Sequence, residues 1–539
     1  MSRFFTAQPQ PKLVKEFGEH PPVQGMDGTL PLYNMPSQVG IYLYNIMPGE
    51  YGNRVRQGYR VWAQNLGGDS VRSIIPFSGK DSTGTESRLF AATTVGIYDV
   101  TTQGQDNPAP VVTFPIQTDQ AGFVSFLHFT DPQGRQTILV ADSVNGLYEY
   151  DPQTPGWTKY TTEITGCDPA KVAFLVSHKG RLWMIENDSS DAWYLPVGQK
   201  AGQASRFQFG SKMRAGGYLV GLFNWTIDGG AGLDDYLLAV SKGGDVMAYR
   251  GADPAFESSW QRVGTWYIGE VPAGRRITVE SGGDTILLST YGLTSVSGLL
   301  QGTDPNVTER NLTGKITRLI RNAILNRGNE KFWEVKTLAE EGAVVINSPV
   351  EGTAKPIQYV LNLNRINEGS GGGWGLWRGI PANTFEGFQG EAYFGTEDGR
   401  VCQMSGSLDE VDITGTSGAP VEFSMLTRYT DYGYPGEYKQ VQFIRPAFIT
   451  SNVMNFEVKA VYDFDLGELP QAPALNVNFG AKWDISLWDE AIWTGLTVSD
   501  DVRGGAGYGR NVAIAIRGSC VSTTTLINIE GNWQKWDFL

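Results

Sequence analysis

The sequence is poor in the residues that build disulfide frameworks, metal centres and membrane spans. Its 539 residues include only three cysteines and three histidines. The cysteines, Cys167, Cys402 and Cys520, are odd in number and far apart, so neither a disulfide framework nor a clustered metal site is expected. No 18 apolar residues run together, and residues 1–22 lack a continuous apolar stretch, so we expect no membrane span and no secretory signal.

Positive charge is also scarce. Lys and Arg number 43 against 57 Asp and Glu, for a net charge of −14. Proteins that read nucleic acids usually carry a basic face, and the totals show no such excess. The charge is uneven: residues 1–75 carry +2, residues 76–410 carry −10 and residues 411–539 carry −6. This asymmetry constrains partners more than it constrains fold.

Catalytic signatures are missing as well. The chain has no H-E-x-x-H zinc motif, no G-x-S-x-G nucleophile elbow and no G-x-x-x-x-G-K-S/T phosphate loop. We therefore expect no enzyme activity, no cofactor and no resident metal. Two carboxylates from distant segments can still meet in a fold, so glycoside hydrolysis stays open as an alternative.

Glycine, by contrast, is abundant: the chain has 67 glycines among its 539 residues, whereas glycine usually makes up only about 7% of a protein. Such an excess indicates many tight turns between short strands. One pattern recurs: an apolar strand, a polar turn with glycine, and a second apolar or aromatic strand. Its best copies read LFAATTVGIYDV and LVADSVNGLYEY, with Gly96 and Gly146 in the same place. Copies begin 43 to 59 residues apart, at Leu89, Leu139, Leu182, Tyr236, Thr285, Val344 and Ala392.

A spacing of roughly 40–50 residues is typical of β-propeller blades, which bury one another by stacking around an axis. We predict an all-β fold in which residues 76–410 form a propeller of about seven blades. Residues 1–75 would form an N-terminal segment and residues 411–539 an additional antiparallel β domain. Leu89, Leu139 and Leu182 are expected at equivalent buried positions. The alternative is a run of unrelated meanders in a β-sandwich.

Residues 314–329 break the strand pattern. Apolar residues recur there at helical spacing and predict one of the few helices. They are Ile316, Leu319, Ile320, Ala323 and Ile324. The opposite face is basic, so it is either a solvated surface or a docking face for an acidic partner or DNA phosphate.

After residue 410 the repeat stops. Strands are expected at 421–429, 440–450, 455–464, 512–518 and 524–533. Between them Trp483, Trp488 and Trp493 lie five residues apart, a spacing that fits neither a helix nor a strand. These tryptophans either cap a local core or anchor a subunit interface, where buried tryptophan is favoured.

Residues 52–79 read GNRVRQGYRVWAQNLGGDSVRSIIPFSG. This stretch resembles the tail nozzle, or tail hub, proteins of short-tailed bacteriophages, which commonly carry R-x-R-x-G-Y-x-x-W-A…G-G…V-R-S-I-x-P-F-x-G before their first propeller strands. The segment WDISLWDEAIW near the C-terminus is similar to the family too. Matching positions in the first stretch are Arg54, Arg56, Gly58, Tyr59, Trp62, Ala63, Gly67, Gly68, Val71, Arg72, Ser73 and Pro76.

The resemblance implies a structural virion protein, made in the host cytoplasm, that forms a homohexameric tube below the portal and its adaptor ring. Such a tube extends the DNA channel, docks fibres or spikes on its outside, and retains and then releases the genome. The family architecture implies that residues 1–75 form a platform-like segment and that residues 411–539 form a tip or fibre-dock domain or part of the platform, which can be discontinuous in sequence. Duplex DNA would pass through the lumen without sequence-specific binding, past acidic or weakly charged walls. Arg54, Arg56, Arg60 and Arg72 are candidate ring-interface residues, with isolated surface arginines as the alternative. The other candidate function is a carbohydrate-binding or glycan-cleaving propeller.

Overall fold

The structure is a computed structural model that describes residues 14–80, 84–154, 156–228, 233–281, 283–302, 304, 311–349, 356–365, 372–452, 454–467, 469, 497–499, 503–504 and 506–536. Its regular structure is almost all β-strand. The described residues form two α-helices, α1 (Val296–Leu300) and α2 (Thr317–Arg327). Neither is long and apolar enough to cross a membrane. The chain divides into a propeller unit, residues 58–372 and 377–418, and a sandwich unit, residues 1–57, 373–376 and 419–539.

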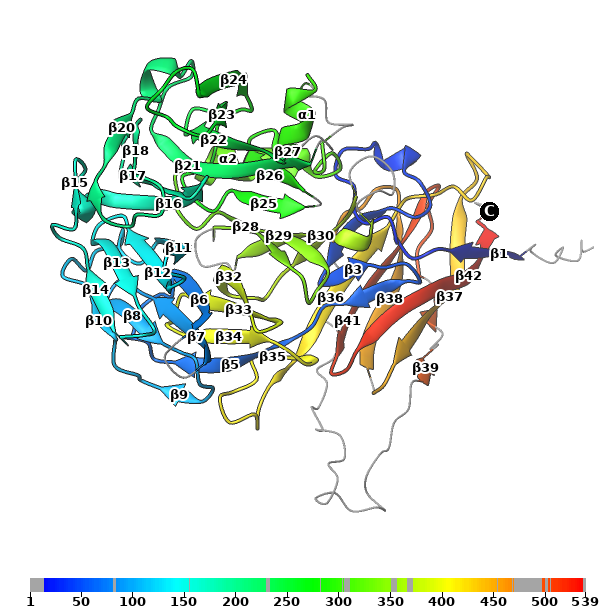
Figure 1. Cartoon of the computed structure of the whole chain (residues 1–539). Coiled ribbons are helices and arrows are strands. Elements are labelled where there is room, and N and C mark those ends of the chain that lie inside the picture. The colour runs from blue at the N-terminus through cyan, green and yellow to red at the C-terminus, as the bar shows by residue number, and fades with distance from the viewer. Residues whose placement is uncertain are drawn as a thin grey trace, which may run out of the picture. The chain divides into compact units, whose positions relative to one another are not determined.

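The propeller unit contains seven small antiparallel sheets among its described residues, arranged in a ring in chain order (Figure 1). The first comprises β6 (Ser73–Lys80), β7 (Thr85–Ala92), β8 (Gly96–Asp99) and β10 (Val112–Thr113). The second comprises β11 (Val124–Thr130), β12 (Gln136–Asp142), β13 (Gly146–Tyr150) and β14 (Trp157–Lys159). The third comprises β16 (Val172–His178), β17 (Arg181–Glu186), β18 (Ala192–Tyr194) and β20 (Ser205–Phe207). The fourth comprises β21 (Leu219–Asp228), β22 (Leu233–Ser241), β23 (Asp245–Gly251) and β24 (Trp260–Tyr267).

The remaining sheets complete the ring. The fifth comprises β25 (Thr278–Ser281), β26 (Asp284–Ser289) and β27 (Gly292–Ser295). The sixth comprises β28 (Glu334–Leu338), β29 (Ala343–Ser348) and β30 (Ile357–Asn362). The seventh comprises β32 (Ala382–Phe388), β33 (Glu391–Thr396), β34 (Val401–Met404) and β5 (Tyr59–Gln64). A short fifth strand, β9 (Gln105–Asp106), pairs parallel with β5 at the edge of the seventh sheet. Three short strands lie outside the seven sheets: β15 (Ile164–Thr165), β19 (Gly202–Gln203) and β35 (Leu408–Asp409).

The ring is closed by a strand from the beginning of the chain. β5 pairs antiparallel with β34, with Tyr59 opposite Met404 and Val61 opposite Cys402. In Figure 1 it is the blue strand beside the yellow strands of the last sheet. The seventh sheet therefore combines residues from both ends of the propeller unit, and no edge of that sheet is left open at β34.

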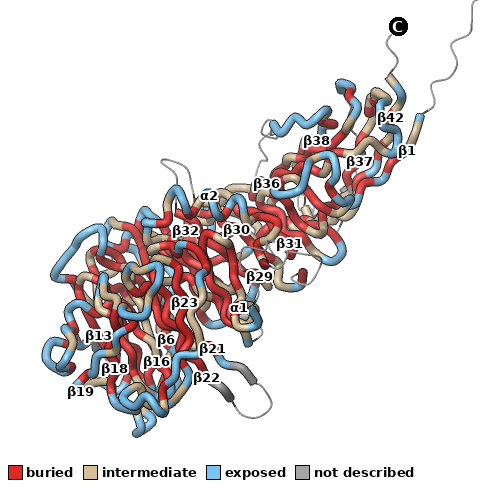
Figure 2. The backbone as a smooth tube through the Cα atoms, turned by 90° about the horizontal axis from the view of Figure 1, so that it is seen from above, coloured by how far each residue is buried: buried red, intermediate tan, exposed pale blue. Residues whose placement is uncertain are grey.

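Strand alternation explains how the sheets stack. In β12, Leu139 and Ala141 join a core with the third sheet, whereas Ile138 and Val140 join a core with the first. Because successive side chains of a strand point to opposite faces, each sheet buries one residue set against each neighbour. Buried residues accordingly follow the strands, and exposed ones gather at the turns (Figure 2). This is the mutual burial expected of propeller blades.

All seven predicted repeat copies begin in the second strand of a sheet, which confirms the repeat. Equivalence of the three leucines holds only in part. Leu89, Leu139 and Leu182 are all fully buried. Leu89 and Leu182 each pack against the preceding sheet of the ring, which is the seventh for Leu89 and the second for Leu182. Leu139 instead packs against the following sheet, the third. The reason is turn length: Asp142 opposes Gly146 across the second turn, whereas Thr93 bonds to Gly96 across the first. One extra turn residue moves the matching position to the other face of the strand.

Glycine is required at Gly146 for two reasons. Its φ is +82°, in the region that disfavours side chains, and an added Cβ would lie 2.6 Å from both the Pro169 carbonyl oxygen and the Ala170 Cα. This turn therefore packs directly on the connection that leads into the third sheet.

The predicted helix is α2, two to three residues shorter at each end than expected. Ile320 and Ile324 are buried, as the stripe predicted, but Leu319 remains 36% exposed. Lys315, which precedes the helix, is not on a solvated face: it is buried and donates to the Gly372 carbonyl oxygen at 2.9 Å. Arg318 and Arg321 do lie exposed.

The sandwich unit is built from strands at both ends of the chain. One sheet has β3 (Ile46–Pro48), β4 (Asn53–Val55), β42 (Thr524–Lys535), β37 (Lys439–Thr450) and β39 (Thr497–Ser499) in that order, with β1 (Val14–Glu19) on β42 and β40 (Arg503–Gly504) on β37. The other has β31 (Gly373–Trp377), β2 (Gly40–Tyr44), β36 (Ala419–Thr427), β41 (Val512–Cys520) and β38 (Met454–Tyr462). Phe448 of the first sheet packs against Phe423 and Phe456 of the second, with ring centroids 6.0 and 5.2 Å apart.

The unit boundaries differ from the predicted 75/76 and 410/411. The first lies at 57/58 because β5 belongs to the propeller, and the last at 418/419. The platform-like segment and the C-terminal β domain are not separate: β1 and β4 both pair with β42, so the two ends of the chain form one unit.

Candidate functional site

The four arginines predicted for a ring interface lie in different units. Arg54 and Arg56 belong to the sandwich unit, and Arg60 and Arg72 to the propeller unit. The sequence places them close together, but the chain passes from one unit to the other between Arg56 and Arg60. They therefore do not form one cluster within either unit.

Arg56 is a buried structural residue of the sandwich unit, only 3% exposed. Its Nε donates to the Asn45 side-chain oxygen at 3.0 Å, and its Nη1 donates to the Gln57 carbonyl oxygen at 2.8 Å. Arg54 is half-buried in β4, opposite Thr525 of β42. Of this pair, Arg54 is the one with surface left for a neighbouring subunit.

Arg60 and Arg72 make contacts within the propeller unit. The Nε of Arg60 donates to the Gln403 side-chain oxygen at 2.7 Å, which ties β5 to β34. Arg72 is buried; its Nη1 donates to the carbonyl oxygens of Asp119 and Ala121, and its guanidinium lies 5.1 Å from the Phe123 ring centroid. A role for either residue between subunits stays a prediction. Trp483, Trp488 and Trp493 lie outside the described residues.

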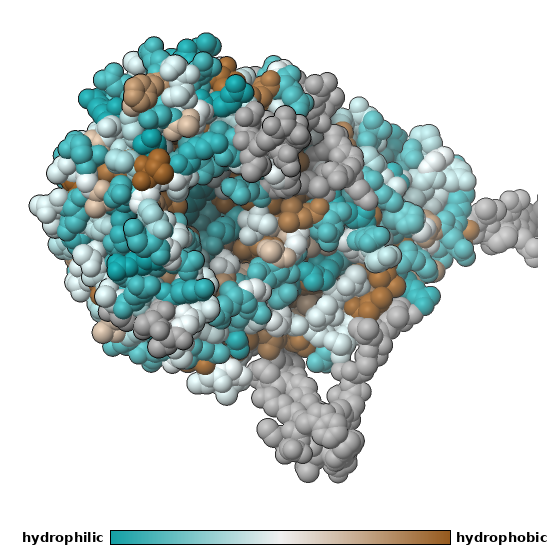
Figure 3. Space-filling view, in the orientation of Figure 1, coloured by the Kyte–Doolittle hydropathy of each residue, from teal (hydrophilic) through white to brown (hydrophobic). Residues whose placement is uncertain are grey.

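The propeller unit has cavities at the centre of its ring, besides a separate one of about 420 Å³ lined by Arg72, Glu330 and Asn383 among others. Two adjoining cavities, of about 120 and 340 Å³, share Val124, Ser125, Arg275 and Arg276 in their linings. The larger is lined by the innermost strands, β6, β11, β16, β21, β25, β28 and β32. The two cavities together are here called the axial channel, and the space-filling view is hollowed near the middle of the ring (Figure 3).

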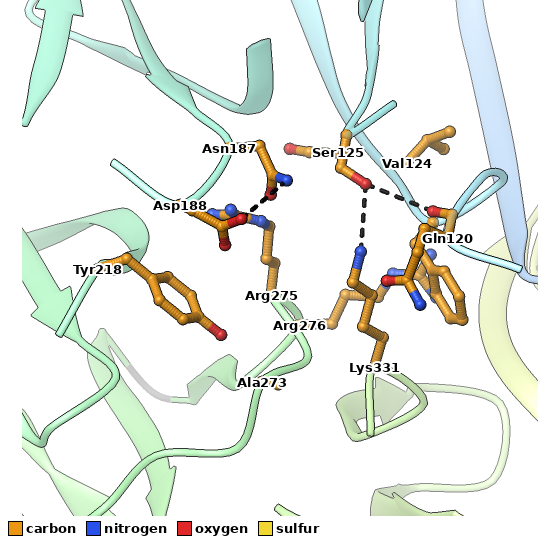
Figure 4. A pocket seen from close by; sticks show the side chains of 12 residues that line it. Gln120, Val124, Ser125, Asn187, Asp188, Tyr218, Ala273, Arg275, Arg276 and Lys331 are labelled. Carbon is orange, nitrogen blue, oxygen red and sulfur yellow. Dashed lines mark hydrogen bonds between the residues drawn. The ribbon is translucent and has the colours of Figure 1, made fainter. Parts of the chain in front are cut away.

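The smaller cavity, here called the cationic cavity, gathers Arg275, Arg276 and Lys331 from the segments that flank the fifth sheet. Asp188 is the single carboxylate among its described lining residues. Arg275, Lys331 and the Tyr218 hydroxyl converge on the same space from three separate segments (Figure 4). The channel is therefore strongly positive at this end.

The partners of these cations are mostly uncharged. Arg275 Nη1 donates to the carbonyl oxygens of Leu219 and Val220 at 3.1 and 2.8 Å. Lys331 Nζ donates to the Ser143 hydroxyl at 3.2 Å. Arg276 differs, because its Nη1 lies 3.5 Å from a Glu334 carboxylate oxygen and donates to the Thr384 hydroxyl at 2.7 Å.

Burial weakens the protonated forms of these groups. It lowers the pKa of Arg275 to about 10. Burial is also the main cause that lowers the pKa of Lys331, and the nearby positive charge of Arg275 lowers it further. Both directions follow from taking cations out of water without pairing them with a carboxylate.

The larger cavity, here called the carboxylate cavity, is lined by Glu280, Glu334 and Glu386, with Lys336 beside them. Burial raises the pKa of Glu334, and the charge of Glu386 acts in the same direction. Lys336 Nζ lies 2.5 Å from a Glu386 oxygen, and the Phe385 backbone N–H donates to Glu334 at 2.7 Å. Both carboxylates are thus engaged within the propeller unit.

Sequence reasoning missed this channel. Arg275 and Arg276 stand in the connection VPAGRRITVE, which carries no recognised motif, and Lys331 lies far along the chain. The one available signal was the adjacent pair Arg275 and Arg276 between two repeat copies, and the sequence alone predicts such a pair to be solvent-exposed rather than part of a cavity. Among the described residues, no group of three or more His, Cys, Asp or Glu side chains could hold a metal ion.

No family model matches the chain. No curated protein matches it either. Among solved structures it is similar to BBS1N in a crystal structure with ARL6DN, soaked with lead, at 11% identity and a TM-score of 0.27 over 62% of this chain and 79% of that one. A likeness at this level carries no argument about function, and the fold described above comes from this chain's own sheets.

Proposed function

We propose that this protein is a structural tail nozzle component of a short-tailed bacteriophage, which assembles as a ring of six below the portal and adaptor. The observation that supports this best is the stretch at residues 52–79, whose matching positions include Arg54, Tyr59, Trp62 and Arg72. In this chain the stretch contains β4, the closure strand β5 and the start of β6. The resemblance therefore falls on the segment that leads from the sandwich unit into the propeller.

The arrangement of the two units is compatible with the proposal. The resemblance implies a platform that can be discontinuous in sequence, and the sandwich unit combines residues 1–57 with 419–539. A propeller inserted between the two halves of such a unit leaves both chain ends on the same unit.

Assembly is tested by electron microscopy and mass photometry of the full chain, alone and in particles that contain it. We expect rings of six copies, coaxial with the tail in particles. A chain that remains monomeric across micromolar concentrations, and is absent from the tail axis of particles, would reject the proposal.

The interface role of Arg54 is tested by Arg54→Ala, with Arg56→Ala as the matched comparison. Arg54 is half-buried, so its removal should weaken ring formation and change the free energy of unfolding by less than about 1 kcal/mol. Arg56 is buried and bonded inside the sandwich unit, so its removal should lower the free energy of unfolding. Intact rings from the Arg54→Ala chain would contradict the interface role.

The walls of the proposed lumen should not bind duplex DNA tightly, because residues 76–410 and 411–539 carry net charges of −10 and −6. Walls rich in Lys and Arg would bind phosphates and resist sliding, whereas acidic walls repel the duplex. We expect purified rings to show no tight binding to duplex DNA at low salt. Salt-sensitive tight binding would exclude a low-friction channel.

The carboxylate cavity supports the second candidate, a propeller that binds or cleaves glycans. Its volume of about 340 Å³ lies within the range of small-ligand sites, and Glu280, Glu334 and Glu386 line it. Glycoside hydrolysis needs one carboxyl free to donate a proton and another to act as base or nucleophile. Release of reducing sugar from bacterial surface glycans, lost in Glu386→Gln, would favour this function over the nozzle.

A further inference from the structure

The cationic cavity brings three cations together with one lining carboxylate, Asp188, and the charge of Asp142, which is outside the lining, also acts on Lys331. Arg276 faces Glu334, but Arg275 and Lys331 donate to carbonyl and hydroxyl oxygens, which satisfy hydrogen bonds and do not neutralise charge. Asp188 lies on an exposed turn, where it accepts from the Asn187 side chain at 3.4 Å and forms no ion pair with the described residues. A cation away from water is costly unless an opposite charge accompanies it.

The donors of this cavity suit an oxyanion. Both hydrogen bonds of Arg275 use Nη1, which leaves its other N–H groups without a partner among the described residues. Planar guanidinium groups bind phosphate and carboxylate through paired N–H groups, and a lysine adds a compact charge. The Tyr218 hydroxyl and the Asn187 amide provide further polar groups at the wall and rim.

Cavity size favours a small ligand. The volume of about 120 Å³ lies below the roughly 300–1,000 Å³ of typical small-molecule sites, so this cavity by itself suits a small oxyanion better than a nucleotide. The lining segments come from the second, third and fourth sheets and from both flanks of the fifth. One anion at this point would therefore link Arg275 and Lys331, which contact the neighbouring connections through carbonyl and hydroxyl oxygens.

We propose that the cationic cavity binds a phosphate-type oxyanion, held by Arg275 and Lys331 with Arg276 behind them, and that this anion stabilises the centre of the propeller. The ligand is either free inorganic phosphate or the terminal phosphate of a larger molecule whose remainder lies outside the mouth near Asp188. This inference does not depend on the proposed tail function.

Calorimetric titration of the full chain with inorganic phosphate, at constant ionic strength in chloride, tests the proposal. We expect saturable binding near one site per chain. Lys331→Met should weaken phosphate binding about tenfold or more, because it removes a charged donor and keeps much of the side-chain volume. Asp188→Asn should strengthen binding several-fold, because it removes the one carboxylate of the lining. Lys171→Met, a mostly exposed lysine outside the cavity, is the matched control and should bind as the unchanged protein does.

Thermal unfolding provides a second readout. A ligand of the folded state raises Tm with its concentration, whereas phosphate also stabilises proteins by exclusion from their surface. The rise in Tm caused by binding should shift to about tenfold higher phosphate or more in Lys331→Met and stay unchanged in Lys171→Met. If a monosaccharide phosphate binds more tightly than inorganic phosphate, the ligand is the terminal phosphate of a larger molecule rather than free phosphate. Absence of saturable binding at 10 mM phosphate, or equal affinity in Asp188→Asn and Lys331→Met, would overturn the proposal; the Asp188 variant keeps the test decisive if Lys331→Met does not fold.

Discussion

His178 is buried in β16 with one hydrogen-bond partner for its ring. Its Nδ1 lies 2.8 Å from the Asn224 side-chain oxygen, while the Asn224 amide group donates to the Ser177 carbonyl oxygen at 2.7 Å. Because the Asn224 oxygen can only accept, Nδ1 carries a proton, and Nε2 has no partner among the described residues. Burial lowers the pKa of His178, and the positive charge of Lys179 lowers it further against the opposing hydrogen bond to Asn224. The unfolded chain then binds a proton more readily than the folded protein does, so stability falls as pH decreases through about 6.5 toward the lower folded-state pKa. We expect His178→Gln to reduce this acid-induced loss, measured as the urea midpoint between pH 7.5 and 5. The exposed His20 provides the control: His20→Gln should retain the full pH dependence, and an unchanged slope in His178→Gln would contradict the assignment.

Strand β5 is the element on which closure of the propeller depends. Val61 is 4% exposed, lies opposite Cys402 of β34 and donates its backbone N–H to the Val411 carbonyl oxygen at 2.8 Å. This N–H points away from β34 and joins the start of the propeller unit to residue 411 near its end. Val61→Pro removes the donor, and the unsatisfied Val411 acceptor alone costs about 1–3 kcal/mol, with further loss where the proline ring distorts β5. Val61→Ala keeps the N–H and should lose roughly 1.5 kcal/mol from the two missing carbons. Urea unfolding followed by circular dichroism distinguishes the two, and equal losses would show that β5 contributes side-chain packing rather than strand pairing.

At the level of the whole molecule, closure of the propeller also prepares the sandwich unit. The Gly58 N–H donates to the Gly406 carbonyl oxygen at 3.0 Å, which holds together two points of the chain that flank the sandwich segments. Bringing the ends of a loop of several hundred residues together costs roughly 5 kcal/mol of chain entropy, and the closed propeller has already met that cost. We therefore expect Val61→Pro to loosen both units, whereas Trp533→Ala, at a fully buried position of β42, should loosen the sandwich unit alone. Hydrogen exchange read on β12 and β42 peptides measures the two units separately. Protection of β42 that survives Val61→Pro would show that the sandwich forms independently of closure.

Local signals in the sequence determined the seven sheets, the position of the second strand in each and five strands of the sandwich unit. Alternation of apolar residues and glycine turns act over a few residues, so they can be recognised without the rest of the fold. Tertiary structure alone decided the closure by β5, the union of the two chain ends in one unit, the opposite faces of Leu89 and Leu139, and the meeting of Arg275, Arg276 and Lys331 on the propeller axis. Each of these depends on pairing between residues far apart in the chain, or on one extra residue in a turn. The burial and charge of the residues involved are therefore set by the folded propeller as a whole and not by any single segment.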